Sequence, residues 1–441
     1  MNLLKVSAVI LPVFVIFSWQ CFLLVHRVTE SPYIDEEFHV PQAQRYCRAD
    51  YQWDPKITTP PGLYLASLAL LRVSNALGLD LHCDIFFLRL TNVVFASCNF
   101  IVLTLIMSKL NKGSLSTGAL ELANLSTFPI LYFFSFLYYT DVISTLSVLL
   151  MYCAFLHNKI ILSAMLGFVS LWMRQTNVIW VAFAAAIHGY NLLDELLKKD
   201  KVRRGKNEIF GRVWAGLQRP HVVSSIVLQE TPFIAVGASF AAFVAWNGGI
   251  VLGDKSAHEA TVHLPQLLYF SAMCAALAPA TFAAAAPRFL RLTLRQPAAT
   301  VLAAAAVAAV VHLNSTAHPY LLADNRHYTF YLWRRLLQPA GFLLAPLYLF
   351  TGHTLLTQLA RHGLFLQLLF AVCAAAAVVP QALLEPRYFV MPFIFYKIHA
   401  PETNCKLSAV NVLVSLLVNV FTVYVYVYCP FTPESKVRFI W

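Results

Sequence analysis

Two adjacent carboxylates and an imidazole stand in the first polar segment of the chain, at Asp35, Glu36 and His39. On a short helix Asp35 and His39 share a face at i and i+4, and Glu36 and His39 share one at i and i+3. A carboxylate beside an imidazole at a membrane surface suits general-base chemistry, because a nearby low-dielectric medium can tune both pKa values. A solvated acidic loop that caps a helix is the alternative, and composition alone leaves it open.

Basic residues able to meet a phosphate stand in a second polar segment, residues 314–335, where Arg326 and His327 follow Asp324. An arginine side chain matches phosphate oxygens bidentately. The segment therefore indicates a site for a phosphate or for sugar hydroxyls. An interfacial loop anchored by Trp333 and Arg334 is the alternative that the residues leave open.

Residues 246–266 form a third polar segment, in which Lys255 and His258 supply hydrogen-bond donors and acceptors near three glycines that permit tight turns. A metal site from His258, Glu259 and His263 is conceivable, but their spacing is not a standard ligand spacing. We favour a polar loop or a substrate contact and expect no metal.

A polar group interrupts the apolar run 160–187, where Arg174, Gln175 and Asn177 stand together. Ionisable residues at membrane depth are costly, so a functional role is the default hypothesis. These residues could order a cavity or bind a sugar, and a purely structural role is an equal alternative.

Arg387 is a second ionisable residue beside an apolar run; it stands directly after Pro386, at the end of the run 363–384. This arginine could break a helix and face a lipid phosphate. Asp141 is a further mark, but it could merely begin a helix, since acidic residues favour helix N-termini.

The elements that must position these residues are long apolar runs. Of 441 residues 59% are apolar and only 12% are charged, too few to coat a soluble protein of this size. This composition excludes a soluble enzyme, a disordered chain and a DNA-binding domain. We interpret the net charge of +11 as a sign of membrane topology, not as a nucleic-acid footprint.

Apolar runs of roughly 17–25 residues predict an all-α, polytopic transmembrane bundle of about 12–14 spans. The runs lie near 5–26, 60–78, 85–107, 118–138, 141–157, 160–187, 222–247, 265–284, 298–313, 336–351, 363–384 and 408–428, with a shorter one at 388–396.

Basic residues predict the orientation of these spans. Eight Lys and Arg lie between Lys198 and Arg219, so the loop 196–221 should be cytoplasmic. This loop divides an N-terminal module, 1–195, from a C-terminal module, 222–441. The polar loops then fall together on the opposite side of the membrane; they are 27–59, 248–264 and 314–335.

The nine cysteines fall at irregular spacings, mostly inside apolar runs, and no C-x-x-C pair exists. We therefore expect neither a zinc site nor a disulfide framework. Cys47 is among the few that lie in a plausible loop.

Seven motifs between residue 33 and about residue 389 carry a resemblance to a known family. In chain order they read YIDEEFHVPQAQRYC, ITTPPGLY, YYTD, RQTN, NGGIVLGDKSAHEA, HPYLLADNRHYTFY and EPRYF. Together they resemble the eukaryotic dolichyl-phosphate-glucose-dependent α-1,2-glucosyltransferases, within the GT-C superfamily of polyprenol-phosphate-sugar glycosyltransferases. The chain departs from the family at Ala257, where the family carries a second His or Ser, and in its Ala-rich stretch 274–310.

The resemblance implies a GT-C-type fold with short lumenal loop helices, in the endoplasmic reticulum membrane, with a lumenal active site. It implies transfer of glucose from dolichyl phosphate glucose to a diglucosylated, dolichyl-pyrophosphate-linked oligosaccharide, forming the terminal α-1,2-linked glucose of the N-glycan precursor. A β-linked donor and an α-linked product imply one inverting displacement. Such a step needs a base, but neither a covalent sugar–enzyme intermediate nor a metal or other cofactor.

The resemblance also suggests roles for individual residues. Asp35 matches the first-loop base of the superfamily, with Glu36 in reserve. The expected donor-binding residues are Arg387, Arg326, His327, Lys255 and His258. The expected acceptor or cavity residues are His39, Arg174, Gln175, Asn177 and Asp324.

Other functions stay open beside this one. Another polyprenol-phosphate-sugar glycosyltransferase of the superfamily is the nearest. A lipid-sugar transporter would bind the same headgroup without a base, and a membrane scaffold would need none of these residues.

Overall fold

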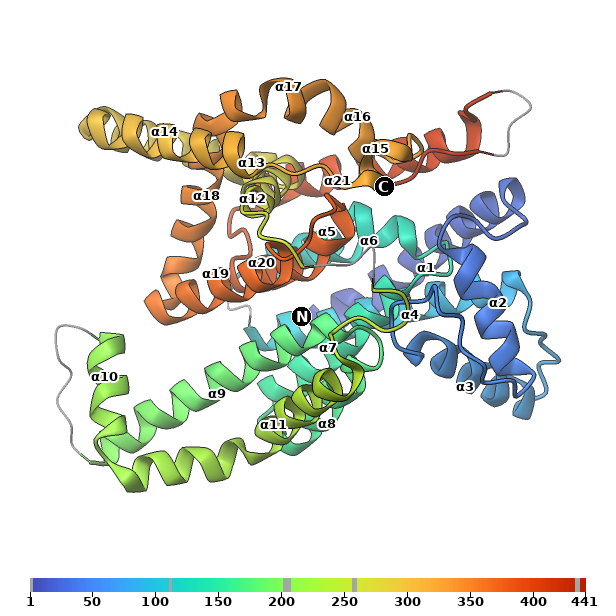
Figure 1. Cartoon of the computed structure of the whole chain (residues 1–441), viewed down its shortest axis with the longest axis horizontal. Coiled ribbons are helices and arrows are strands. Elements are labelled where there is room, and N and C mark those ends of the chain that lie inside the picture. The colour runs from blue at the N-terminus through green and yellow to red at the C-terminus, as the bar shows by residue number, and fades with distance from the viewer. Residues whose placement is uncertain (1–2, 111–112, 201–207, 256–259, 433–436) are drawn as a thin grey trace.

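The described part of the chain is helical. A computed structural model describes residues 3–110, 113–200, 208–255, 260–432 and 437–441, and these residues form helices and turns without a β-strand (Figure 1). By length and composition, six described segments can cross a membrane, and α12 with α13, bent by 111°, would make a seventh. The prediction of an all-α polytopic membrane protein is confirmed. The six segments are α1 (Leu3–Val28), α4 (Ile85–Leu110), α11 (Pro220–Asn247), α14 (Pro297–Asn314), the stretch Tyr328–His362, and α21 (Cys405–Tyr428).

Two runs that we expected to be continuous spans are broken. Run 160–187 holds α8 (Ile160–Leu171) and α9 (Val178–Lys199), because Arg174 takes an extended conformation between them. Run 118–138 holds α5 (Leu115–Ser126) and α6 (Pro129–Phe134); Pro129, which has no N–H to donate, starts the second helix. The expected count of 12–14 spans includes these broken runs and helices shorter than 18 residues, which the six segments above leave out.

The other helices are shorter, and α2 among them is polar. Figure 1 shows α9 and α11 side by side, with α10 across their ends, and α19 and α20 in the opposite half of the molecule. Their bounds are α2 (Glu36–Cys47), α3 (Gly62–Ala76), α7 (Thr140–Leu156), α10 (Glu208–Leu217), α12 (Pro265–Leu277), α13 (Pro279–Arg295), α15 (Pro319–Ala323), α16 (Tyr328–Leu332), α17 (Gln338–Ala340), α18 (Ala345–Leu359), α19 (Leu364–Val378) and α20 (Val390–His399).

Helix α7 is the centre of the packing, since it contacts α4 and α8 and is buried over nearly its whole length. The turn before it is held by Asn92 of α4, whose amide donates to the carbonyls of Leu137 (2.7 Å) and Tyr139 (2.9 Å). Buried backbone carbonyls need such partners. These bonds fix the start of α7, where the YYTD motif stands.

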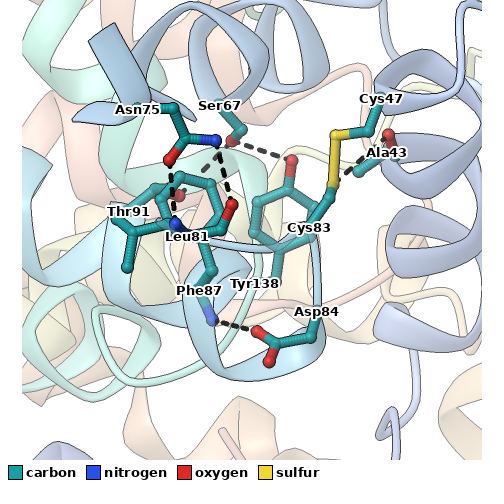
Figure 2. The surroundings of a disulfide bond; sticks show 10 residues. All are labelled: Ala43, Cys47, Ser67, Asn75, Leu81, Cys83, Asp84, Phe87, Thr91 and Tyr138. Atoms are coloured by element: carbon teal, nitrogen blue, oxygen red, sulfur yellow. Dashed lines mark hydrogen bonds between the residues drawn. A yellow bond between two sulfur atoms is a disulfide. The ribbon is translucent and has the colours of Figure 1, made fainter. Parts of the chain in front are cut away.

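A disulfide joins α2 to the segment before α4, which corrects our expectation that no disulfide is supported. Cys47, the last residue of α2, bonds to Cys83, with their Cα atoms 6.4 Å apart (Figure 2). The two cysteines are 36 residues apart in sequence, and only the packing of α2 on α3 and α4 brings them together.

We expect that replacing both Cys47 and Cys83 by Ser lowers the free energy of unfolding by about 2–4 kcal/mol, because the unfolded chain regains the freedom of a long loop. Thermal unfolding of the purified protein in detergent measures this. Cys405→Ser is the matched control, since Cys405 is exposed and outside the disulfide. Equal unfolding temperatures for wild type and the double variant would contradict the expected contribution.

Candidate active site

A cavity of about 690 Å³ lies where α2, the start of α7, the RQTN turn and the EPRYF turn meet. Residues from segments 56–59 and 250–254 also line it. Six of the residues that the sequence pointed to line it, and they come from three separate motifs. They are Asp35, His39, Arg174, Gln175, Asn177 and Arg387.

Arg387 is the cation at the centre of this wall. Its Nη1 lies 2.9 Å from Asp35 Oδ2 and 3.6 Å from Asp141 Oδ2, and its Nε donates to Glu385. The guanidinium carbon stands 5.1 Å from the ring centres of both Phe134 and Tyr139. Ring faces and carboxylates both favour a cation, so the guanidinium is firmly placed.

Asp141 is a cavity-wall residue that the sequence interpretation left as a helix start. It lies in the first turn of α7, nearly fully buried, and its Oδ1 meets Arg174 Nη1 at 3.0 Å. Arg174 Nε also donates to Thr140 Oγ1 at 3.1 Å. Asp141 thereby joins the two arginines of the cavity. An acid at the edge of a long apolar run was the signal that could have revealed it.

Asp35 presents its carboxylate to the cavity from the N-terminus of α2. Its side chain is 35% accessible and makes no capping bond to the helix, while its backbone N–H donates to the Tyr139 hydroxyl at 3.3 Å. Burial would raise the pKa of this carboxyl, but Arg387 and His39 outweigh it and lower the pKa below its ordinary value. Asp35 is therefore ionised at neutral pH.

The Glu36 side chain points away from the cavity, which argues against its role as the reserve base. The side chain is fully buried and pairs with Arg89 of α4, whose Nε donates to Oε1 at 2.8 Å. The backbone N–H groups of Tyr138 (2.6 Å) and Tyr33 (3.0 Å) donate to the same carboxylate. Glu36 is not among the residues that line the cavity. Its role is to anchor α2 beneath Asp35.

His39 lines the cavity one turn after Asp35, as the i, i+4 spacing predicts. Its Nδ1 lies 2.6 Å from the Tyr64 hydroxyl of α3. Burial, aided by Arg387 and Arg174, lowers the pKa of His39 to about 4 against the opposing charges of Asp35 and Asp141. His39 is therefore neutral at pH 7 and can exchange hydrogen bonds without carrying charge.

Gln175 and Asn177 hold the wall together. Gln175 Nε2 donates to the Thr58 carbonyl at 2.9 Å, and Asn177 Nδ2 donates to Ser144 Oγ at 2.9 Å and to the Ser170 carbonyl at 2.8 Å. These bonds connect the RQTN turn to α7, α8 and segment 56–59, which supports the structural alternative for both residues.

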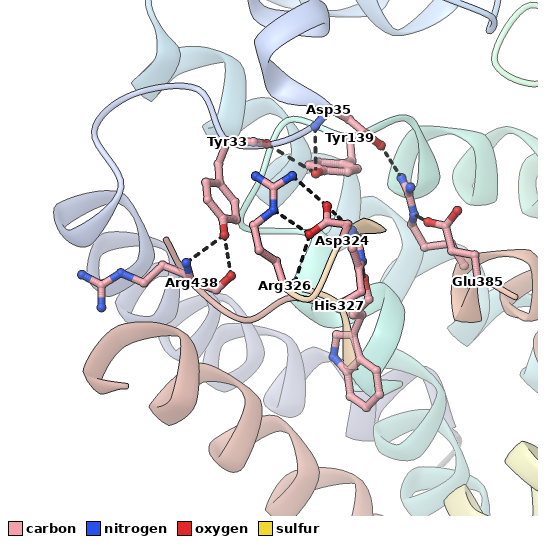
Figure 3. A network of polar contacts seen from close by, with 10 residues as sticks. Tyr33, Asp35, Tyr139, Asp324, Arg326, His327, Glu385 and Arg438 are labelled. Carbon is pink, nitrogen blue, oxygen red and sulfur yellow. Dashed lines mark hydrogen bonds and ion pairs between the residues drawn. The ribbon is translucent and has the colours of Figure 1, made fainter. Parts of the chain in front are cut away.

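Asp324, Arg326 and His327 form a separate cluster beside the cavity and are not among the residues that line it. Asp324 was expected at the cavity or acceptor, and Arg326 and His327 at the donor phosphate. Arg326 binds Asp324 through two nitrogens, Nε–Oδ1 at 2.8 Å and Nη2–Oδ2 at 2.7 Å, and stands over the ring of Tyr33 (Figure 3). His327 Nε2 lies 3.5 Å from Asp324 Oδ2. Burial opposes the charge of His327, yet Asp324 and Glu385 raise its pKa.

The same cluster is joined to the end of the described chain. Ile440 N–H donates to the Arg326 carbonyl at 2.9 Å, and His327 Nδ1 lies 2.7 Å from the Trp441 carbonyl. The Tyr33 hydroxyl contacts the backbone of Arg438 (Figure 3). The cluster therefore supports the segment that leads into Asp35.

Lys255, a further candidate, is not among the residues that line the cavity. The Lys255 ammonium donates to the Asn247 carbonyl. His258 lies outside the described residues, as does Glu259 of the conceivable metal set. Across the residues that the structure describes, no three His, Cys, Asp or Glu side chains gather as metal ligands would.

Chemically, the cavity holds an ionised carboxylate that can accept a proton and two guanidiniums that can hold an anion.

Comparison with known proteins identifies the family of this chain. The DIE2/ALG10 family matches residues 29–398. The chain belongs to this family. Relatives from human, Drosophila melanogaster and Arabidopsis thaliana are 36%, 38% and 33% identical; the alignments cover 95% of this chain and 95%, 94% and 96% of the relatives.

All three relatives are named Dol-P-Glc:Glc(2)Man(9)GlcNAc(2)-PP-Dol alpha-1,2-glucosyltransferase. No solved structure matches the chain. The resemblance carried by the seven motifs is confirmed, and family membership spans every segment that lines the cavity.

Proposed function

We propose that this chain is a dolichyl-phosphate-glucose-dependent α-1,2-glucosyltransferase that adds the terminal glucose to the diglucosylated lipid-linked oligosaccharide. The observation that carries the proposal is the accessible Asp35 carboxylate 2.9 Å from Arg387 in a cavity lined by family motifs. A base beside an anion-binding cation is what transfer from a sugar phosphate requires.

The reaction is a single displacement. The acceptor hydroxyl oxygen attacks C1 of glucose while its proton passes to Asp35, and the bond from C1 to the phosphate oxygen breaks. The electron pair of that bond leaves with dolichyl phosphate, and Arg387 and Arg174 stabilise the charge. One displacement inverts a β-linked donor to an α-linked product. No step calls for a metal or another cofactor, and we propose that none is used.

We place this reaction on the lumenal side of the endoplasmic reticulum membrane. The Cys47–Cys83 disulfide supports the placement, since disulfides persist in oxidising compartments and α2, which starts beside Asp35, carries one of the two cysteines. The partners are then two lipids, dolichyl phosphate glucose as donor and the dolichyl-pyrophosphate-linked oligosaccharide as acceptor.

Purified protein in lipid nanodiscs, supplied with dolichyl phosphate glucose and a diglucosylated acceptor, should form one new α-1,2 linkage per acceptor. Dolichyl phosphate mannose in place of the donor is the control for sugar identity. Binding of both lipids without transfer would favour a lipid-sugar transporter, and transfer of mannose at the same rate would favour another member of the superfamily. In cells without the protein, the lipid-linked glycan should lack its terminal glucose.

A further inference from the structure

The charges around Arg387 leave little room for an additional anion. Arg387 meets three carboxylates, Asp35, Asp141 and Glu385, and the second cation, Arg174, shares Asp141 with it. Asp35, Asp141 and both guanidiniums line the cavity, and Glu385 pairs with Arg387 outside the lining; together these five groups carry a net charge of −1. The other charged residues on the cavity surface, Lys56 and Asp254, balance each other. A sugar phosphodiester brings one more negative charge, so one carboxylate must give up its contact with Arg387.

The three carboxylates differ in how easily they can leave. Asp141 is 2% accessible and held by Arg174, and Glu385 is 9% accessible and lies two residues from Arg387 on the same turn. Asp35 is 35% accessible, and its carboxylate makes no capping bond to α2. The helix behind it is fixed independently by the buried Glu36–Arg89 pair. The Asp35 side chain can therefore turn away from Arg387 without movement of α2.

We propose that the phosphate of the donor replaces the Asp35 carboxylate on Arg387, so that donor binding itself releases the catalytic base. Asp141 and Glu385 act as positioning residues that keep Arg387 in place during the exchange. This inference rests on the proposed function. The exchange sets the order of the reaction, because the acceptor hydroxyl can be deprotonated only after the donor has bound.

Donor binding by charge-neutral variants tests the exchange. The probe is a short-chain polyprenyl phosphate glucose, titrated into the full-length protein in nanodiscs. Asp35→Asn should bind it about fivefold more tightly than wild type, since a partly exposed ion pair no longer competes. Arg387→Gln should bind at least about tenfold more weakly, because the charge-assisted contact to phosphate is lost. Glu37→Gln, an exposed carboxylate two residues from Asp35, should match wild type.

The double variant Asp35→Asn with Arg387→Gln shows whether the gain passes through Arg387. The exchange predicts that the tighter binding disappears in the Arg387→Gln background. Equal or weaker binding by Asp35→Asn, a gain that persists in the double variant, or an equal gain in Glu37→Gln would each overturn it. These outcomes are separate from the proposed function, which fails only if the wild-type protein transfers no glucose.

The pH dependence of transfer is a second measurement. In the free protein Arg387 lowers the pKa of Asp35; once phosphate occupies Arg387, that pKa should rise. The acidic limb should then lie at higher pH in kcat than in kcat/KM for the donor. Coincident limbs, or a lower limb in kcat, would overturn the exchange. The charged and titratable groups around Asp35 are His39 from α2, Tyr139 and Asp141 from the start of α7, Arg174 from the RQTN turn, His327 from the segment before α16, and Glu385, Arg387 and Tyr388 from the EPRYF turn.

Discussion

Asp35→Asn should lower glucosyl transfer by a factor of about 10²–10⁴ while the protein stays folded, which is the range expected when a general base is lost. The amide fills the same volume but cannot take the acceptor proton. Folding should be unaffected because the Asp35 side chain is accessible and makes no capping bond to α2. Transfer by purified variants at saturating donor and acceptor measures the effect.

Two controls isolate the base in this experiment. Glu37→Gln removes a neighbouring exposed carboxylate from the same helix turn and should keep wild-type transfer. The thermal unfolding temperature of Asp35→Asn should match wild type. Wild-type transfer by Asp35→Asn would remove Asp35 from the mechanism and direct attention to Asp141, another acid on the cavity wall.

Glu36→Ala should have the largest effect on stability, although it changes the very next residue. The Glu36 carboxylate and the Arg89 guanidinium are both fully buried. Removing one partner leaves the other charge buried without compensation, which costs about 3–5 kcal/mol. The buried N–H groups of Tyr33 and Tyr138 would also lose their acceptor. We expect low yield and a strongly lowered unfolding temperature in detergent.

The double variant Glu36→Leu with Arg89→Met distinguishes a structural role from a catalytic one. Apolar residues of similar volume leave no charge buried without compensation, so this protein should recover part of the lost stability and part of its transfer activity. The N–H groups of Tyr33 and Tyr138 still lack their acceptor, so full stability should not return. A Glu36→Ala protein that unfolds at the wild-type temperature but transfers no glucose would instead return Glu36 to the list of candidate bases.

The contrast between Asp35 and Glu36 shows where sequence interpretation stopped. Both are acids in the first polar loop, and the sequence marked both as candidates. Which one faces the cavity depends on how α2 is rotated, and that rotation is set by Arg89, 53 residues further along the chain. No local pattern records this contact. The pairing of Cys47 with Cys83 was missed for the same reason.

The basic residues that the sequence marked also separate into one that lines the cavity and others that lie beside it. Arg387 reaches Asp35 across 352 residues of sequence, whereas Arg326 and His327 are held by Asp324 beside the cavity and do not line it. Asp141 was undervalued because an acid at a helix start has an ordinary explanation. Its importance comes from Arg174 and Arg387, which approach it from two other turns.

The sequence by itself determined that the chain is an all-helical membrane protein, that its polar residues gather in a few motifs, and to which family these motifs belong. These properties are local, because apolar run length and motif composition are set by neighbouring residues. The tertiary structure alone decided which of these side chains meet in one cavity and which only support it. That choice depends on packing between distant segments, where a helix rotated by one residue would exchange a carboxylate that lines the cavity for a buried one.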